Sequence, residues 1–249
     1  MKIAVISDIH GNIEALQSVL LNIRNEKCEK IFCLGDLAMA GPQPVETIEK
    51  IQDLIEKGNF YSIQGNTDEM ICSFDAAQVE DLKKNNPVMG NALEDDKNII
   101  PQKLKEFLCK LPPFLEIEQD GVKMLFVHGS PRKNNENIYP DLPLEKVEEM
   151  ISGTKVDVVF AGHTHIPCGY QTNTNQTVVN TGSIGRPFTE RPEACYVIIE
   201  TNENGTFTIK HNFVKYNKEK AAEILSKRKF QGAEKLAKML LEPTERYPR

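Results

Sequence analysis

The feature that most constrains the fold is a repeated pattern of apolar run, polar turn and amphipathic stretch in the first third of the chain. Residues 2–7 form a β-branched run that ends in the polar segment 8–12, after which apolar residues recur at helical spacing. The pattern returns with the apolar runs 31–34 and 60–63, each followed by a polar turn. This alternation predicts an α/β fold whose sheet has a parallel portion and right-handed crossovers.

The middle of the chain predicts an insertion and a second set of strands. Residues 69–110 lack strand alternation and contain Asn-Asn-Pro, so we expect a helical insertion, or lid, over whatever the polar turns form. The runs 115–118 and 122–127 flank Gln-Asp-Gly, which indicates a hairpin. A helix near 144–151 and a buried strand at 156–160 follow.

Short strands with turns dominate the remainder of the chain. We expect antiparallel strands at 168–172, 176–180, 194–201 and 206–216, closing a second sheet. Residues 218–241 have apolar side chains on roughly one face, which predicts an amphipathic helix with Gly232 as a break. We therefore expect one domain over residues 1–216, with a helical extension over 217–249 packed on it.

The charge and the cysteines exclude several classes of protein. Thirty basic and 36 acidic side chains give a net charge of −6, so no partnership with long nucleic acid or anionic membrane is expected. No stretch has the roughly 18 apolar residues of a membrane span, and Asp8 interrupts the first apolar run, which argues against a signal peptide. Six cysteines without a Cys-x-x-Cys pair indicate a reducing, cytoplasmic compartment. A homo-oligomer is compatible with the sequence.

Metal-competent side chains stand at the ends of five predicted strands. Taken singly, each has an ordinary explanation, such as a helix-start acid, a turn-forming Asn or a hydrogen-bonded strand-end His. Their conjunction is informative, because ligands of open α/β sheets bind at the carboxyl ends of the strands. Four of the five histidines belong to the set, and His211 is assigned a structural role. The set is Asp8, His10, Asp36, Asn66, His128, His163 and His165.

The types of donor indicate a divalent-metal centre. The set contains oxygen and imidazole ligands and no thiolate. Such ligands indicate a site for Mn²⁺, Fe²⁺ or Zn²⁺, and they argue against a cysteine-rich structural zinc site. Seven ligands are too many for one tetrahedral ion, but they are enough for two ions if a carboxylate bridges them. Two ions about 3.5 to 4 Å apart can activate a shared water and clamp a phosphoryl group. The predicted reaction is therefore hydrolysis of a phosphate ester.

The same residues carry a family resemblance over residues 1–216. In chain order, Asp8-x-His10, Gly35-Asp36, Gly65-Asn66, His128 and Gly162-His163-x-His165 resemble the five-block signature of the calcineurin-like metallophosphoesterases, especially the small prokaryotic phosphodiesterases. The resemblance implies a four-layer α/β/β/α sandwich with two mixed sheets. It also implies a first metal on Asp8, His10, Asp36 and His165, and a second on Asp36, Asn66, His128 and His163, with Asp36 bridging.

The resemblance implies a phosphodiesterase with two divalent ions per chain, Mn²⁺ being expected and Fe, Zn or Ni the alternatives. Its substrate would be a small phosphodiester or nucleotide, attacked by a metal-bridging hydroxide. Two alternatives keep the same centre: a dinucleoside polyphosphate hydrolase, or a phosphomonoesterase such as a protein phosphatase. A non-catalytic interaction scaffold is the third alternative, and the complete ligand set disfavours it.

Thr67 departs from the family pattern. Many members have a His after the Gly-Asn pair that protonates or hydrogen-bonds the leaving group. A threonine hydroxyl donates a hydrogen bond but is a weak acid, which disfavours poor leaving groups and phosphoprotein substrates. The expected catalytic residues are Asp36, Asn66, His128 and Thr67. Phosphate contacts are expected from Arg132, Arg186 and Ser183, with Lys133 and Arg191 as weaker candidates and solvated loops as the alternative.

Overall fold

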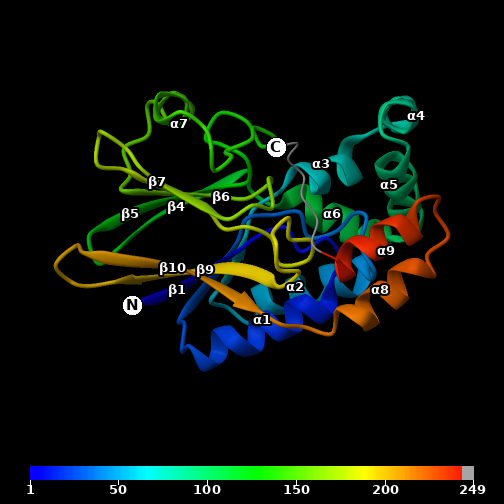
Figure 1. Ribbon diagram of the computed structural model, residues 1–249, viewed down its shortest axis with the longest axis horizontal. Coiled ribbons are helices and arrows are strands. Elements are labelled where there is room, and N and C mark those ends of the chain that lie inside the picture. Colours follow the sequence, from blue (N-terminus) through cyan, green and yellow to red (C-terminus); the bar gives the residue numbers. More distant parts are fainter. Residues whose placement is uncertain (243–249) are drawn as a thin grey trace.

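The computed structural model describes residues 1–242, which form two five-stranded mixed sheets stacked face to face (Figure 1). The first sheet has the strand order β10-β9-β1-β2-β3, in which β1, β2 and β3 are parallel and β9 is antiparallel to β1. Its strands are β1 (Lys2–Ile6), β2 (Lys30–Cys33), β3 (Phe60–Ser62), β9 (Ala194–Thr201) and β10 (Phe207–Val214).

The second sheet has the order β4-β5-β6-β8-β7. Its three central strands run parallel, and the two outer strands are antiparallel to their neighbours. The strands are β4 (Phe114–Gln119), β5 (Val122–Val127), β6 (Val158–Ala161), β7 (Cys168–Gln171) and β8 (Thr177–Asn180).

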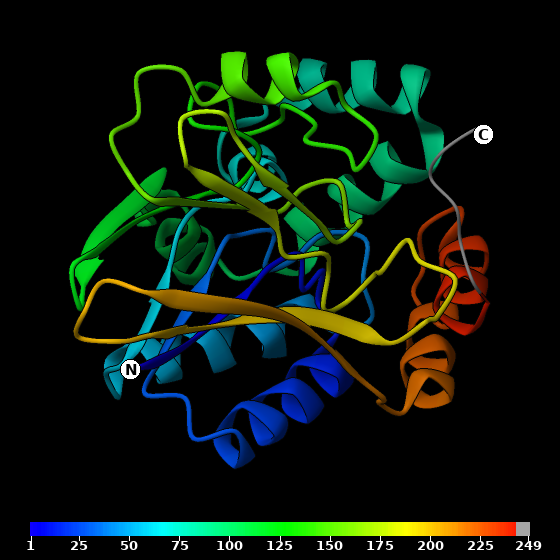
Figure 2. The same ribbon diagram turned by 60° about the vertical axis from the view of Figure 1, so that its left-hand side comes forward.

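Side-chain alternation along β1 explains the layers. Ile3 and Val5 pack between the sheets, whereas Ala4 and Ile6 face the helices on the outer side of the first sheet. Those helices are α1 (Ile13–Asn25) and α2 (Pro44–Glu56). On the opposite side, α7 (Leu144–Met150) packs on the second sheet (Figure 2). The four-layer α/β/β/α sandwich is thus confirmed.

Two helical regions flank one end of the sandwich (Figure 1). The predicted insertion contains α3 (Asn66–Ser73), α4 (Ala76–Asn85), α5 (Pro87–Ile99) and α6 (Gln102–Lys110). The predicted C-terminal helix is two helices, α8 (Lys218–Ser226) and α9 (Ala233–Leu241), because the chain turns before Gly232, which has a φ of 103°. Residues 243–249 of the expected extension lie outside the described residues. Within residues 1–242, no helix is long and apolar enough to cross a membrane.

One expectation about strand placement was wrong. The strands after residue 168 were expected to close the second sheet together, but only β7 and β8 belong to it. The β9–β10 hairpin pairs instead with β1 of the first sheet, where Ile3 lies opposite Ile199. The hairpin supplies Val197 and Ile199 to the apolar layer between the sheets, so its apolar face is buried at this edge of the first sheet.

Candidate metal centre

The seven predicted ligands follow the carboxyl ends of five strands that meet at one end of the sandwich. Asp8 and His10 follow β1, Asp36 follows β2, and Asn66 begins α3 after β3. His128 follows β5, and His163 and His165 follow β6. Two groups of their ligand atoms, each within 4.8 Å of one another, are formed by Asp8, His10 and His165 and by Asp8, Asp36 and His128.

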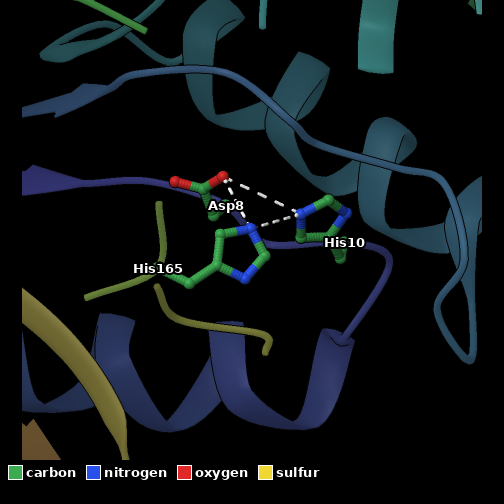
Figure 3. Close-up of side chains that lie close together, drawn as sticks. All are labelled: Asp8, His10 and His165. Carbon is green, nitrogen blue, oxygen red and sulfur yellow. Dashed lines mark hydrogen bonds and ion pairs between the residues drawn. The ribbon is translucent and has the colours of Figure 1, made fainter. Parts of the chain in front are cut away.

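The first group contains two imidazoles and a carboxylate that point toward one another (Figure 3). His165 Nε2 lies 3.1 Å from Asp8 Oδ1 and 3.1 Å from His10 Nε2. The other Asp8 oxygen, Oδ2, accepts hydrogen bonds from the Ser7 hydroxyl and from the backbone N–H of His163. Asp8 Oδ1 is therefore the oxygen available to a cation.

Asp36 lies between the two groups. Its Oδ2 is 3.6 Å from His10 Nε2 and 3.4 Å from His128 Nε2, and Oδ1 accepts the backbone N–H of Thr67. Asn66 Oδ1 lies 2.9 Å from His128 Nε2. A carboxylate oxygen placed between imidazoles of both groups has the position that a bridging ligand requires.

The ring orientations test whether a cation fits. His10, His128 and His165 each place Nδ1 against a backbone carbonyl, those of Met39, Leu34 and Arg186, at 3.0, 2.7 and 2.7 Å. Because a carbonyl only accepts, each Nδ1 carries a proton, so a neutral ring presents a lone pair on Nε2. These Nε2 atoms converge on one another and on carboxylate oxygens. Such a set of acceptors fits divalent cations, and backbone partners of this kind orient metal-binding histidines.

The electrostatics favour bound positive charge. Burial lowers the pKa of His165 to about 4, and burial with the charge of His128 lowers that of His163 to about 4, so both rings are neutral at neutral pH. Burial alone would also neutralise Asp36 and His128, but their mutual attraction prevails: the pKa of Asp36 falls to about 2 and that of His128 rises to about 10. His128 therefore carries a proton on Nε2 that a bound divalent cation would replace. Despite burial, the pKa of Asp8 is also lowered, by His165 and His10.

Unusual backbone geometry holds these ligands. Asp8, His10, Asp36, His163 and His165 all have φ between 46° and 67°, in the left-handed region. Such conformations in non-glycine residues cluster at functional sites, where the surrounding structure enforces them.

Glycines next to the ligands permit close approach. A Cβ on Gly65 would lie 2.2 Å from Asp36 Oδ1, and a Cβ on Gly162 would lie 2.6 Å from Asp8 Oδ2 and 2.1 Å from Ser7 Oγ. The glycines of the sequence motifs therefore have a steric reason in this structure.

Asp68 supports the centre and was missed by the sequence reasoning. Its buried carboxylate accepts the backbone N–H groups of Asp36, Leu37 and Gly65, at 2.8, 2.9 and 3.0 Å. These bonds join the turns after β2 and β3. An acid at the third position of α3 was a usable signal, because carboxylates are favoured in the first turn of a helix.

The remaining predicted residues divide into those near the centre and those away from it. His163, Thr67 and Arg186 line the pocket beside the ligands, and the Thr67 hydroxyl faces Ala38 O at 3.4 Å. Ser183 is fully buried and donates its hydroxyl to Asp8 O, so it braces the β1 turn. Arg132 is 42% exposed, forms ion pairs with Glu136 and Glu149, and does not line the pocket.

Two of the residues outside the ligand set lie elsewhere in the described chain. Lys133 N donates to Ser130 Oγ within the exposed loop after β5. His211 Nε2 lies 2.7 Å from Asn180 O, which agrees with the structural role expected for it.

Fold and donor set together are those of a metallophosphoesterase. Residues 1–204 match the calcineurin-like phosphoesterase superfamily domain, and the chain belongs to that superfamily. Membership of this superfamily supports a hydrolase and implies divalent metals, for which the acidic and imidazole groups described above are the candidate ligands.

Individual relatives match almost the whole chain. The uncharacterized protein MJ0912 of Methanocaldococcus jannaschii is 32% identical over 252 residues, covering 92% of this chain and 98% of that protein. The hypothetical protein PH1004 from Pyrococcus horikoshii OT3 superposes with a TM-score of 0.87 at 25% identity, covering 98% of this chain and 99% of that one. A metallophosphoesterase from Sphaerobacter thermophilus shares the fold, with a TM-score of 0.78 at 24% identity and coverage of 98% and 100%.

Proposed function

We propose that the protein is a divalent-metal-dependent phosphodiesterase that hydrolyses a small phosphodiester. The observation that carries this proposal is the convergence of imidazole Nε2 atoms and carboxylate oxygens on both sides of Asp36. The two ions, Mn²⁺ in this proposal, would be held by Asp8, His10, Asp36 and His165 and by Asp36, Asn66, His128 and His163. When bound, they supply a water of lowered pKa and neutralise charge on the phosphoryl oxygens.

The chain's own residues position the reacting groups. The backbone N–H of Thr67 fixes the Asp36 carboxylate, and backbone carbonyls hold the imidazoles in one orientation, so the ligands need little rearrangement. Arg186 lines the pocket beside His165 and is placed to donate to a non-bridging phosphoryl oxygen.

Thr67 takes the place of the family's usual acid. Thr67 lines the same pocket, and its hydroxyl, by giving up its long 3.4 Å bond to Ala38 O, can donate a hydrogen bond to the departing oxygen without transferring a full proton. This favours esters whose alcohol leaves readily, which supports a diester substrate over a phosphoprotein.

The test compares a diester with a monoester. Protein stripped by a chelator and reloaded with Mn²⁺ should hydrolyse bis(p-nitrophenyl) phosphate faster than p-nitrophenyl phosphate, with nitrophenolate as the readout. Asp36→Asn should lose at least about a hundredfold in activity, since even outer-shell partners of metal ligands contribute that much. It should also retain less metal by elemental analysis.

The matched control is Asp53→Asn, which alters an exposed carboxylate on α2 and should behave like wild type. No Mn²⁺-stimulated hydrolysis of either ester, with Asp36→Asn equal to wild type, would refute the proposal. Faster hydrolysis of the monoester, or of a dinucleoside polyphosphate, would assign the centre to those reactions instead.

A further inference from the structure

The pocket beside the metal centre has a wall that the phosphoesterase chemistry does not explain. Its volume is about 370 Å³, near the lower end of the roughly 300–1,000 Å³ of small-molecule sites. One side consists of the metal-ligand candidates with Thr67. The other side is apolar and comes from several elements of the chain.

Methionines dominate the apolar side. Four of the chain's seven methionines line the pocket: Met39 from the turn after β2, Met70 from α3, Met89 from α5 and Met239 from α9. Leu82 and Asn86 also line the pocket, as does Phe188, which stacks on the ring of His165 with centroids 4.8 Å apart and planes inclined by 10°. Thioethers adapt to irregular shapes and make favourable contacts with aromatic rings, so this wall suits a flat, unsaturated ligand group.

The charge distribution limits how many phosphates the pocket can take. Apart from Asp36 and the histidines, Arg186 is the one charged residue among the described lining residues. The Arg186 Nη1 group lies 3.8 Å from Met89 Sδ, and its Cζ lies 5.8 Å from the centroid of Phe188. A single phosphate can be met by the metals and Arg186, whereas further phosphates would be buried against thioethers. Burying an unpaired charge in this way is costly.

The apolar wall comes largely from segments outside the ligand motifs. Met89 belongs to the helical insertion, and Met239 lies beyond residue 204, where the match to the superfamily domain ends. The two segments are packed together: a Cβ on Gly232, just before α9, would lie 2.8 Å from a methyl carbon of Val88. The apolar lining is therefore built in part by the helical insertion and the C-terminal helices, which lie outside the two sheets.

We infer that this methionine-lined pocket binds the flat unsaturated group of the substrate, a nucleobase or an aryl ring, so that the substrate is a phosphodiester with one phosphate and one such group. The inference rests on the proposed function for the position of the phosphate. It excludes polyphosphate-bridged dinucleotides and phosphoprotein segments as the preferred substrates.

Binding of three monophosphates to the Mn²⁺-loaded protein tests the inference by calorimetry. Methyl phosphate reports the phosphate contacts alone, whereas phenyl phosphate and adenosine monophosphate add a ring. We expect the ring-bearing compounds to bind at least about tenfold more tightly than methyl phosphate, from several thioether–ring contacts.

The double variant Met89→Ala/Met239→Ala should lose most of this advantage and leave the affinity for methyl phosphate unchanged. The matched control, Met150→Ala, removes a partly buried methionine from the far face and should keep the advantage. If the double variant fails to fold, Met239→Gln, which keeps the side-chain volume, should lower the ring advantage alone.

The results of these binding measurements distinguish the inference from the proposed function. Equal binding of the three compounds to wild type overturns the inference, and so does a ring advantage that survives in the methionine variants. Mn²⁺-dependent diester hydrolysis without a ring preference would overturn this inference and leave the proposed function standing. Absence of binding by all three compounds would overturn this inference, whereas the proposed function would still be decided by the Mn²⁺-dependent hydrolysis assay.

Discussion

Arg228 offers a quantitative test of how the C-terminal extension supports the metal centre. Its guanidinium, 8% exposed, forms ion pairs with Asp95 at 2.5 Å and Asp96 at 2.8 Å, and donates to Gly41 O at 2.8 Å. The second oxygen of Asp96 accepts the backbone N–H of Ala40. Arg228 thus links the turn between α8 and α9, helix α5 and the turn after Asp36, in which Met39 O orients His10.

The cost of removing the guanidinium follows from Asp96. This carboxyl is fully buried, and burial raises its pKa from 3.8 to about 6 even with Arg228 beside it. Because the folded-state pKa lies above the ordinary value, the folded protein binds the proton more tightly than the unfolded chain. Ionised Asp96 therefore destabilises the fold by about 3 kcal/mol above pH 6, and this penalty disappears as the pH falls toward 3.8.

Arg228→Met removes the compensating cation and raises the pKa of Asp96 further. At about pH 7.5 the carboxyl then takes up a proton on folding, which limits its total penalty to about 5 kcal/mol. The net destabilisation is about 2 kcal/mol from Asp96, plus about 1 kcal/mol each for the lost bond to Gly41 O and the lost ion pair with Asp95. At about pH 5 Asp96 is protonated in both folded proteins, so the difference should shrink to about 2 kcal/mol.

Urea denaturation of wild type and Arg228→Met at the two pH values measures both differences. Titration of the histidines is common to the two proteins and cancels. Arg132→Met is the matched control, since Arg132 also pairs with two carboxylates but is 42% exposed, and we expect a change within about 1 kcal/mol at both pH values. Loss of less than 1 kcal/mol at the higher pH, or an equal loss at both, would refute the reasoning about Asp96.

Two further predictions concern the ligands and the leaving group. Gly162→Ala places a methyl group 2.6 Å from Asp8 Oδ2 and 2.1 Å from Ser7 Oγ, so it should lower the Mn²⁺ content by about tenfold or more in elemental analysis. Gly169→Ala in β7, where the nearest atom is 3.9 Å away, should retain the metal, and equal metal content in both variants would contradict the steric argument. Thr67→His restores a stronger acid and should raise the hydrolysis rate of alkyl esters more than that of p-nitrophenyl esters. An equal effect on both ester types, measured as kcat/KM, would show that the leaving group needs no acid at this position.

The sequence was sufficient to locate the ligands of the first sheet. Short, mostly apolar runs end just before the turns that contain Asp8, Asp36 and Asn66, and parallel neighbouring strands bring those turns together. The histidines after β5 and β6 come from the other sheet, so periodicity alone does not place them opposite the first three. For these histidines, the prediction that they join the first three ligands came from the order of the motifs and the family resemblance.

Other features depend on tertiary contacts that local pattern does not encode. The alternation of the β9–β10 hairpin predicts two antiparallel strands, but it is compatible with an edge of either sheet. The four pocket methionines are widely separated in the chain, and each occupies a position that would suit an ordinary core residue. Arg228 appears as one cation in a charged segment until folding places Asp95 and Asp96 beside it.

The strained turns that carry the ligands are held in place by hydrogen bonds from neighbouring residues. Five ligand residues hold left-handed backbone conformations, each of which costs of order 1 kcal/mol or more. Hydrogen bonds around the turns offset this cost. The Asp68 carboxylate accepts the backbone N–H groups of Asp36 and Gly65, and the Ser183 hydroxyl donates to the Asp8 carbonyl. These contacts are made by the protein itself, so the fold compensates the strain at Asp36 and Asp8. Removing these contacts should therefore lower both the stability of the protein and its affinity for metal.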